Sequence, residues 1–80
     1  MKKIALSING KLYVMERKKA MGVMQIAKEK NKGKNVIVGL EKEKVIECRL
    51  DEYPNAYDLL TATQDWLKLG YRVHSVKSYR

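Results

Sequence analysis

The stretch from Asn55 to Ser78 most constrains what this chain can fold into, because it predicts a capped helix, a stop and a strand in succession. Pro54 precedes the helix, at a place where its fixed φ and missing N–H do no harm. Asn55 can cap the first turn, and Asp58 places a negative charge beside the positive end of the helix dipole. We therefore expect an amphipathic helix with one side turned toward a core. The residues of that side are Ala56, Leu59, Leu60, Thr63, Trp66 and Leu67.

A glycine and an alternating pattern follow this helix. Gly70 is typical of a residue that ends a helix, and Tyr71–Val76 has the pattern of a strand. Because successive side chains of a strand point to opposite faces, we expect Tyr71 and Val73 to face inward and His74 to face outward.

An Asn-Gly pair near the amino end predicts a β-hairpin. Asn9-Gly10 separates two apolar runs, residues 3–8 and 11–15, and both turn positions of a tight hairpin need a positive φ. A two-residue loop fixes the register of the two runs. The expected pairs are Ile8 with Lys11, Leu6 with Tyr13 and Ile4 with Met15. The expected core side consists of Ile4, Leu6, Ile8, Tyr13 and Met15.

Residues 16–31 favour a helix, with a strand as the alternative. Most of them are good helix formers, and Gly33 is well placed to follow the helix end. Against a helix stand Gly22, which costs about 1 kcal/mol relative to alanine, and Ile26, which lies off the apolar stripe. A strand from Val23 to Glu29 is the competing interpretation. The apolar residues at helical spacing are Ala20, Val23, Met24 and Ala27.

Two β-branched runs, residues 36–40 and 45–50, predict a second hairpin. Their apolar faces match if residue 40 opposes 46, 38 opposes 48 and 36 opposes 50. This register requires an odd-numbered loop centred on Glu43. A two-residue loop would instead bury a carboxylate or expose valines.

Together these elements predict one compact α+β domain spanning residues 1–80. We expect the order ββαββαβ, a mainly antiparallel sheet of two hairpins plus a C-terminal strand, and one or two helices on one face. The single cysteine, Cys48, excludes an internal disulfide and a cysteine-based zinc site. Because no run approaches the roughly 18 apolar residues of a spanning helix, we expect a cytoplasmic protein without a membrane segment.

The net charge of +8 is concentrated in the first 34 residues, which hold ten Lys or Arg against two Glu. Such a region attracts phosphates or acidic proteins, although a lysine-rich composition alone would also produce it. If residues 17–31 form a helix, Arg17, Lys18 and Lys28 lie on the side away from the apolar stripe. The candidate contacts to a nucleic-acid backbone are Arg17, Lys18, Lys19, Lys28, Lys30, Lys32 and Lys34.

The chain holds few groups that could converge on an active site. Cys48 and His74 are a conceivable nucleophile and base, but no third residue orients them and no local signature accompanies them. The simpler interpretation makes Cys48 an inward-facing strand residue and His74 an outward-facing one. No glycine-rich phosphate loop and no metal-ligand spacing is present in the sequence. We therefore expect a non-enzymatic protein with no cofactor and no metal site.

Two kinds of binding protein fit this chain. The first contacts nucleic-acid backbone through residues 17–34, with steep salt dependence and little sequence preference. The second is a protein-binding inhibitor or adaptor, of the kind that phages and mobile elements encode. It would dock on an acidic protein surface through the basic region or through an edge strand. The C-terminal strand, from Tyr71 to Lys77, would also allow a homodimer. A membrane partner is not expected, because the basic helix offers no Trp, Phe or Leu to insert.

Overall fold

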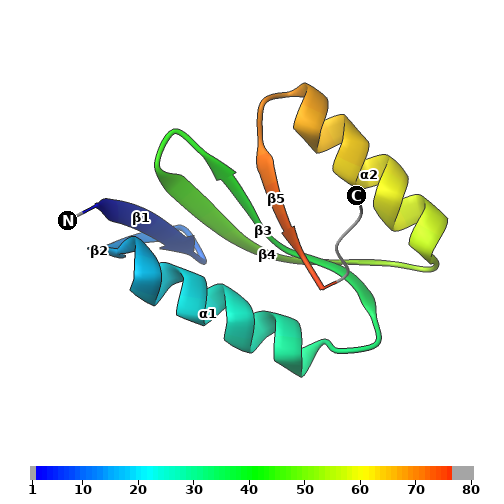
Figure 1. Ribbon diagram of the computed structural model, residues 1–80, viewed down its shortest axis with the longest axis horizontal. Helices are drawn as coiled ribbons and strands as arrows, with labels where there is room; N and C mark the ends of the chain where they lie inside the picture. The colour runs from blue at the N-terminus through cyan, green and yellow to red at the C-terminus, as the bar shows by residue number, and fades with distance from the viewer. Residues whose placement is uncertain (1, 77–80) are drawn as a thin grey trace.

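A computed structural model describes residues 2–76, and its elements follow the expected order ββαββαβ (Figure 1). Residues 17–30 are helical, so the helix interpretation of this region is confirmed and the strand alternative is wrong. The elements are β1 Lys3–Ile8, β2 Lys11–Glu16, α1 Arg17–Lys30, β3 Asn35–Lys42, β4 Val45–Tyr53, α2 Ala56–Lys68 and β5 Arg72–Ser75.

The five strands form one mixed sheet in the order β2-β1-β4-β3-β5. Both hairpins, β1–β2 and β3–β4, are antiparallel, and β5 adds to β3 in the same sense. The pair β1–β4 is parallel. The expected sheet, mainly antiparallel and built from two hairpins and a last strand, is therefore confirmed, with β2 and β5 at its two edges.

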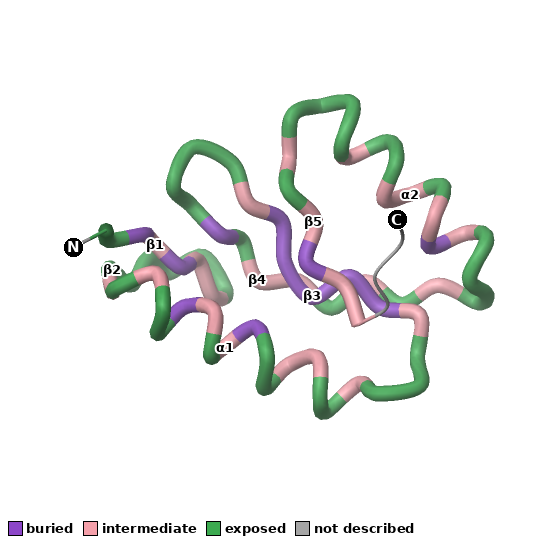
Figure 2. Tube along the Cα trace, viewed as in Figure 1, coloured by how far each residue is buried: buried purple, intermediate pink, exposed green. Residues whose placement is uncertain are grey.

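The two helices cover opposite faces of the sheet, whereas they were expected on one face. Val36 and Val38 of β3 join the core cluster under α1, and Ile37 and Leu40 join the cluster under α2. Neighbouring residues of a strand point to opposite faces, so the helices lie on opposite sides. The unbroken apolar run of β3 explains this arrangement, because it suits a strand buried on both faces (Figure 2).

The first hairpin has the predicted register. Asn9 and Gly10 take φ values of 51° and 81°, as a two-residue loop of this kind requires. Leu6 pairs with Tyr13, and Leu6 is fully buried in the core under α1. Tyr13, however, is 46% exposed. Its expected core position is wrong because β2 is an edge strand that extends beyond the cover of α1.

The second hairpin does not have the predicted register. Lys42 pairs with Val45 across a two-residue turn, in which Glu43 and Lys44 both have a positive φ. The expected odd-numbered loop is unnecessary because the register shifts within β3, between residues 37 and 39. At this bulge, between the pairs Ile37–Asp51 and Gly39–Cys48, β4 has two residues where β3 has one, and Val36 and Val38 remain in the cluster that contains Ile46.

Gly39 at this bulge allows α1 to approach β3 closely. A Cβ at this position would lie 2.7 Å from the Sδ atom of Met24 and 3.3 Å from Ile46. Met24 is itself buried at the centre of the cluster under α1. The absence of a side chain at residue 39 therefore sets the distance between this helix and the sheet.

We expect Gly39→Ala to destabilise the protein by about 1–3 kcal/mol, because the added methyl group overpacks the core against Met24. The loss should be partly relieved in the Met24→Ala background, where the colliding sulfur is absent, and urea unfolding of the four proteins of this cycle measures the coupling. Gly22→Ala is the matched control. Nothing lies within 4 Å of a Cβ there, so it should stabilise α1 by roughly 0.5–1 kcal/mol. Additive losses at residues 24 and 39 would contradict the proposed contact.

Candidate nucleic-acid interface

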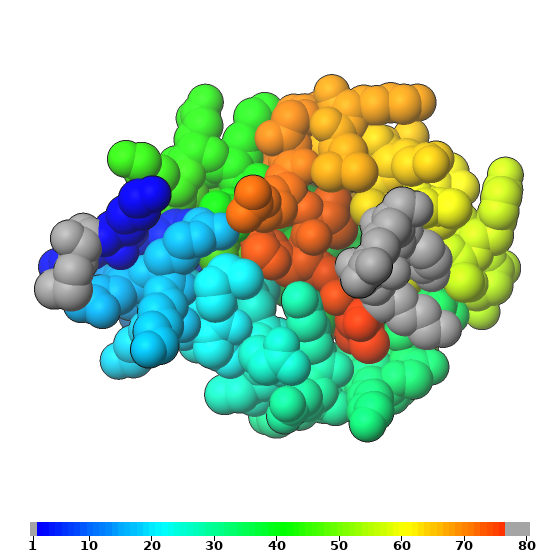
Figure 3. Space-filling view, viewed as in Figure 1, coloured from blue at the N-terminus to red at the C-terminus, as the bar shows by residue number. Residues whose placement is uncertain are grey.

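The seven candidate residues lie on α1 and on the loop to β3, which share the front face of the molecule in Figure 3. Five of them are exposed: Lys18, Lys19, Lys30, Lys32 and Lys34. Arg17 and Lys28 are only partly exposed. They flank the buried stripe of α1, and their expected place on the outward side of the helix is therefore wrong.

The exposed lysines form two clusters rather than one. Lys18 and Lys19 lie in the first turn of α1 and form the amino-end cluster. Lys30 lies in the last turn and forms the carboxyl-end cluster with Lys32 and Lys34 in the following loop. At 1.5 Å per residue, the two ends of this lysine series lie about 18 Å apart along the helix axis.

Arg17 is held by an ion pair with Glu41 of β3. Its Nη1 and Nη2 atoms donate to both carboxylate oxygens, at 2.5 and 3.0 Å. His74 of β5 approaches the same carboxylate, with Nε2 3.0 Å from Oε1. Since an ionised carboxylate only accepts hydrogen bonds, the proton of the neutral imidazole lies on Nε2. Arg17 therefore joins α1 to two strands and is not a free cation for a ligand.

His74 is buried, with 5% of its surface exposed, so its expected outward position is wrong. His74 lies on the face of β5 opposite Tyr71 and Val73, which belongs to the side of the sheet that α1 covers. Arg72, on the same face, is exposed. Val76, two residues further on, packs in the same cluster under α1. Side chains alternate along β5 as expected, but the face that carries His74 is covered at this residue.

The neighbours of Glu41 shift the pKa values of this group of charges. Hydrogen bonds from Arg17 and then from His74 hold the pKa of the Glu41 carboxyl below its usual value, and the pKa of Arg17 is raised in return. Burial lowers the pKa of His74, and the positive charges of Lys28 and Arg17 act in the same direction. Glu41 opposes this effect without cancelling it.

We expect the protein to lose stability as the pH falls from 7 toward 4. The folded-state pKa of His74 is depressed, so its contribution is complete above its ordinary value of 6.5 and is lost below it. The contribution of Glu41 is lost at lower pH, below its ordinary value of 4.5, since its pKa is also depressed. Thermal melts across this range measure the decline. His74→Gln keeps a donor for Glu41 and should flatten the curve between pH 5 and 7, whereas an unchanged curve would contradict the role of His74.

The amino end of α1 carries an unusual number of cations. Residues 17–19 are all basic, the first turn has no acidic residue, and the side chain of Glu16 at the N-cap makes no capping hydrogen bond. The other helix shows the ordinary arrangement, in which Asn55 accepts a hydrogen bond of 2.8 Å from the N–H of Asp58. Positive charges at a helix amino end oppose the helix dipole, so the cations of α1 lower its stability.

Three further lysines, Lys2, Lys3 and Lys44, lie near this end of α1. Together with Ile4 and Arg17 they line a cavity of about 490 Å³. Lys2 and Lys3 belong to the basic region of the first 34 residues but were not among the expected site residues. Lys44 was not expected here, because it comes from the turn between β3 and β4, which only the fold brings to the start of α1.

We expect Lys18→Glu to stabilise the protein by about 0.3–1 kcal/mol, because it replaces a repulsive charge at the helix amino end with an attractive one. Lys30→Glu is the matched control. It makes the same charge change in the last turn and should destabilise by a similar amount. Urea unfolding at low salt measures both. Equal effects of the two substitutions would contradict the dipole argument.

No lysine within residues 2–76 forms an ion pair with a carboxylate of this part of the chain. The carboxylates that do form ion pairs serve other groups: Glu41 pairs with Arg17 and His74, and Arg49 holds Glu47 and Asp51. The lysine charges on α1 and its loop are therefore not neutralised by carboxylates of the described residues.

Cys48 and His74 do not form a catalytic pair in this structure. They lie on either side of Gly39 across three strands, about 10 Å apart at the usual strand spacing. The sulfur of Met24 occupies the space above Gly39. Burial also raises the pKa of the Cys48 thiol, which disfavours the reactive thiolate. Among residues 2–76, no group of three or more His, Cys, Asp or Glu is placed to hold a metal ion.

Comparison with known proteins returned no match: no family model, no curated protein and no solved structure matches this chain. No helix in the described part of the chain is both long enough and apolar enough to cross a membrane.

Proposed function

We propose that this protein binds the phosphate backbone of nucleic acid through the exposed lysines of α1 and its flanking loops. The observation that carries the proposal is the set of five exposed lysines at the two ends of α1, none of which is paired with a carboxylate of the described residues. Cations at the amino end of α1 lower the stability of the helix, and a phosphate bound there offsets this unfavourable charge.

The side chains on this surface favour backbone contacts over base recognition. Lysine acts as a point charge toward phosphate, whereas base edges are read mainly by Arg, Asn and Gln. The arginine of α1 is engaged by Glu41, and Gln25 is the amide side chain within the helix. The two lysine clusters lie about 18 Å apart, far enough to reach backbone on both sides of a duplex groove about 12 Å wide. We therefore favour a duplex, bound with little sequence preference.

A protein-binding inhibitor or adaptor is the competing proposal. Several large apolar side chains are exposed on α2 and just after it, away from α1, as in a protein-protein contact surface: Tyr57, Leu67 and Leu69. The same lysines would then meet an acidic protein surface. The two proposals differ in the salt dependence of binding and in the ligand that is bound.

The test is fluorescence anisotropy with short labelled duplexes and single strands over a range of salt concentrations. We expect duplex binding that weakens with a log–log slope of about −3 to −5, as release of counterions from several phosphates requires. Lys32→Glu combined with Lys34→Glu should weaken binding roughly tenfold or more, because each change replaces a phosphate contact with a repulsive charge.

Lys11→Glu combined with Lys68→Glu is the matched control, because it changes the net charge equally at exposed lysines away from α1. If both pairs of substitutions weaken binding equally, the binding reflects net charge alone and the assigned surface is wrong. No binding of any nucleic acid at low salt would refute the proposal and would favour the protein-binding alternative.

A further inference from the structure

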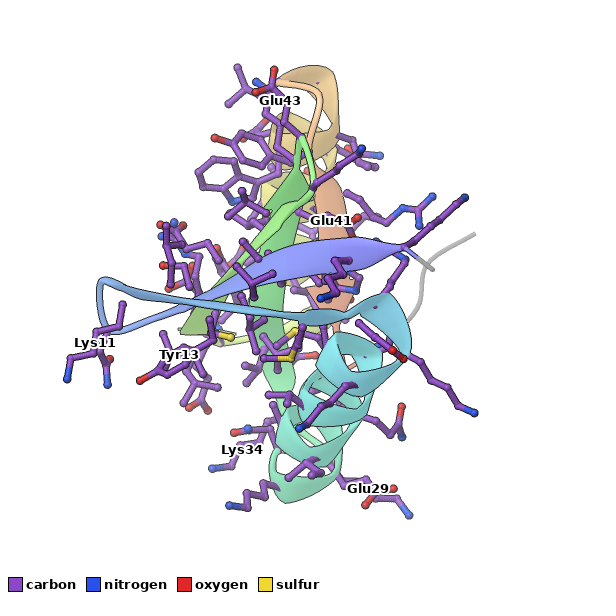
Figure 4. All side chains as sticks on the ribbon, turned by 90° about the vertical axis from the view of Figure 1, so that its left-hand side faces the viewer. Lys11, Tyr13, Glu29, Lys34, Glu41 and Glu43 are labelled. Carbon is purple, nitrogen blue, oxygen red and sulfur yellow. The ribbon has the colours of Figure 1, made fainter. Side chains whose placement is uncertain are left out.

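The edge strand β2 exposes an apolar run that is not protected against strand pairing. Leu12, Tyr13 and Val14 are 66%, 46% and 72% exposed. No charge, proline or bulge interrupts residues 12–15, although edge strands of monomeric proteins usually carry such features. Figure 4 shows Lys11 and Tyr13 at the turn end of the hairpin, at a distance from α1. The outer edge of β2 is therefore accessible to another strand.

The register of the hairpin shows which backbone groups of β2 point outward. The N–H of Ala5 donates to the carbonyl of Lys44, at 3.0 Å, and thus points away from β2. Ala5 pairs with Val14 in the hairpin, so the N–H and C=O of Val14 point to the free edge. Residues two apart along a strand share this direction, and the backbone groups of Leu12 therefore also point outward.

The side chains beside this edge suit a second copy of the same chain, despite its net charge of +8. The uncovered face of the hairpin carries Ala5, Ser7, Leu12 and Val14, and α2 lies over the other half of the sheet (Figure 1). At the end of the hairpin Lys3 lies opposite Glu16 in the strand register, so the positive and negative charges there balance. The lysine clusters belong to α1 and its loop, not to this face.

We propose that β2 pairs with β2 of a second copy to form an antiparallel dimer with a continuous sheet. A two-fold axis at Tyr13 places Leu12 opposite Val14 of the second copy and joins them through their outward-pointing backbone groups. Shifting the axis to Val14 would set Leu12 opposite Glu16, and shifting it to Leu12 would set Val14 opposite Gly10. Of these three registers, only pairing about Tyr13 sets both Leu12 and Val14 opposite an apolar residue.

This edge replaces the C-terminal strand as the dimer surface that we favour. β5 spans only Arg72–Ser75 in the described chain, and Lys77 of the expected strand lies outside it. β2 has six residues and the larger apolar exposure. A single pair of short strands buries little area, so we expect a dissociation constant of about 1–100 µM.

Sedimentation velocity over a range of protein concentrations tests the dimer. We expect a rise from the monomer mass of 9.3 kDa to twice that value as the concentration increases. Leu12→Lys should abolish the rise. Leu69→Lys is the matched control, because it adds the same charge at a residue of similar exposure, 60%, and should leave the dimer intact. Circular dichroism verifies that both variants are folded.

Disulfide trapping tests the register in a Cys48→Ser background, which removes the native thiol. Cα atoms of a non-hydrogen-bonded antiparallel pair lie about 4.5 Å apart, within the range for a disulfide, so Tyr13→Cys should form a covalent dimer on oxidation. Leu12→Cys should not, because its two copies would lie about 8 Å apart. A monomer at every concentration, loss of the dimer in Leu69→Lys, or trapping at residue 12 instead of 13 would overturn the proposal.

Discussion

The burial of β3 on both faces is the constraint on which the rest of the structure depends. A central strand with an apolar side chain on each face needs a cover on each side, and the chain supplies one helix for each. The bulge beside Gly39 reconciles the two demands, since it lets the face under α1 keep its valines while the hairpin turn stays tight. The placement of α1, and with it the direction of its lysines, follows from how closely this helix can approach that strand.

Glu41 holds α1 to the sheet by electrostatic contacts, in addition to the apolar packing. Its carboxylate is shared between the first residue of α1 and a histidine on β5, so one acidic group joins three elements. Breaking such a pair on one side leaves an uncompensated charge in a partly buried place, which costs more than the pair itself contributes. Because Arg17 is bound to Glu41, the cations available on the basic surface are lysines.

Local signals were sufficient to predict most of the secondary structure. Asn9-Gly10, the Asn55 cap and the Gly70 stop each act within a few residues, and each was interpreted correctly. The register of β3 against β4 was not predictable in the same way, because a bulge is decided by packing on both faces of the sheet. The buried position of His74 was not predictable from local signals either, because it depends on α1 covering that face of the sheet. The lysines of α1 could be found from the sequence, whereas the contribution of Lys44 depends on a turn that only the fold brings to the start of the helix.

The parallel pairing of β1 with β4 has a consequence for the order in which the molecule assembles. Ala5 pairs with Val45, so this contact closes a far longer loop than either hairpin does. During synthesis from the amino end, the first hairpin and the lysine-bearing helix therefore exist before the strand that joins them to the sheet. Until β4 is made, both edges of the first hairpin are open, and the arrival of β4 closes one of them. In the folded protein the outer edge of β2 is then the one edge of this hairpin that stays unpaired within the sheet.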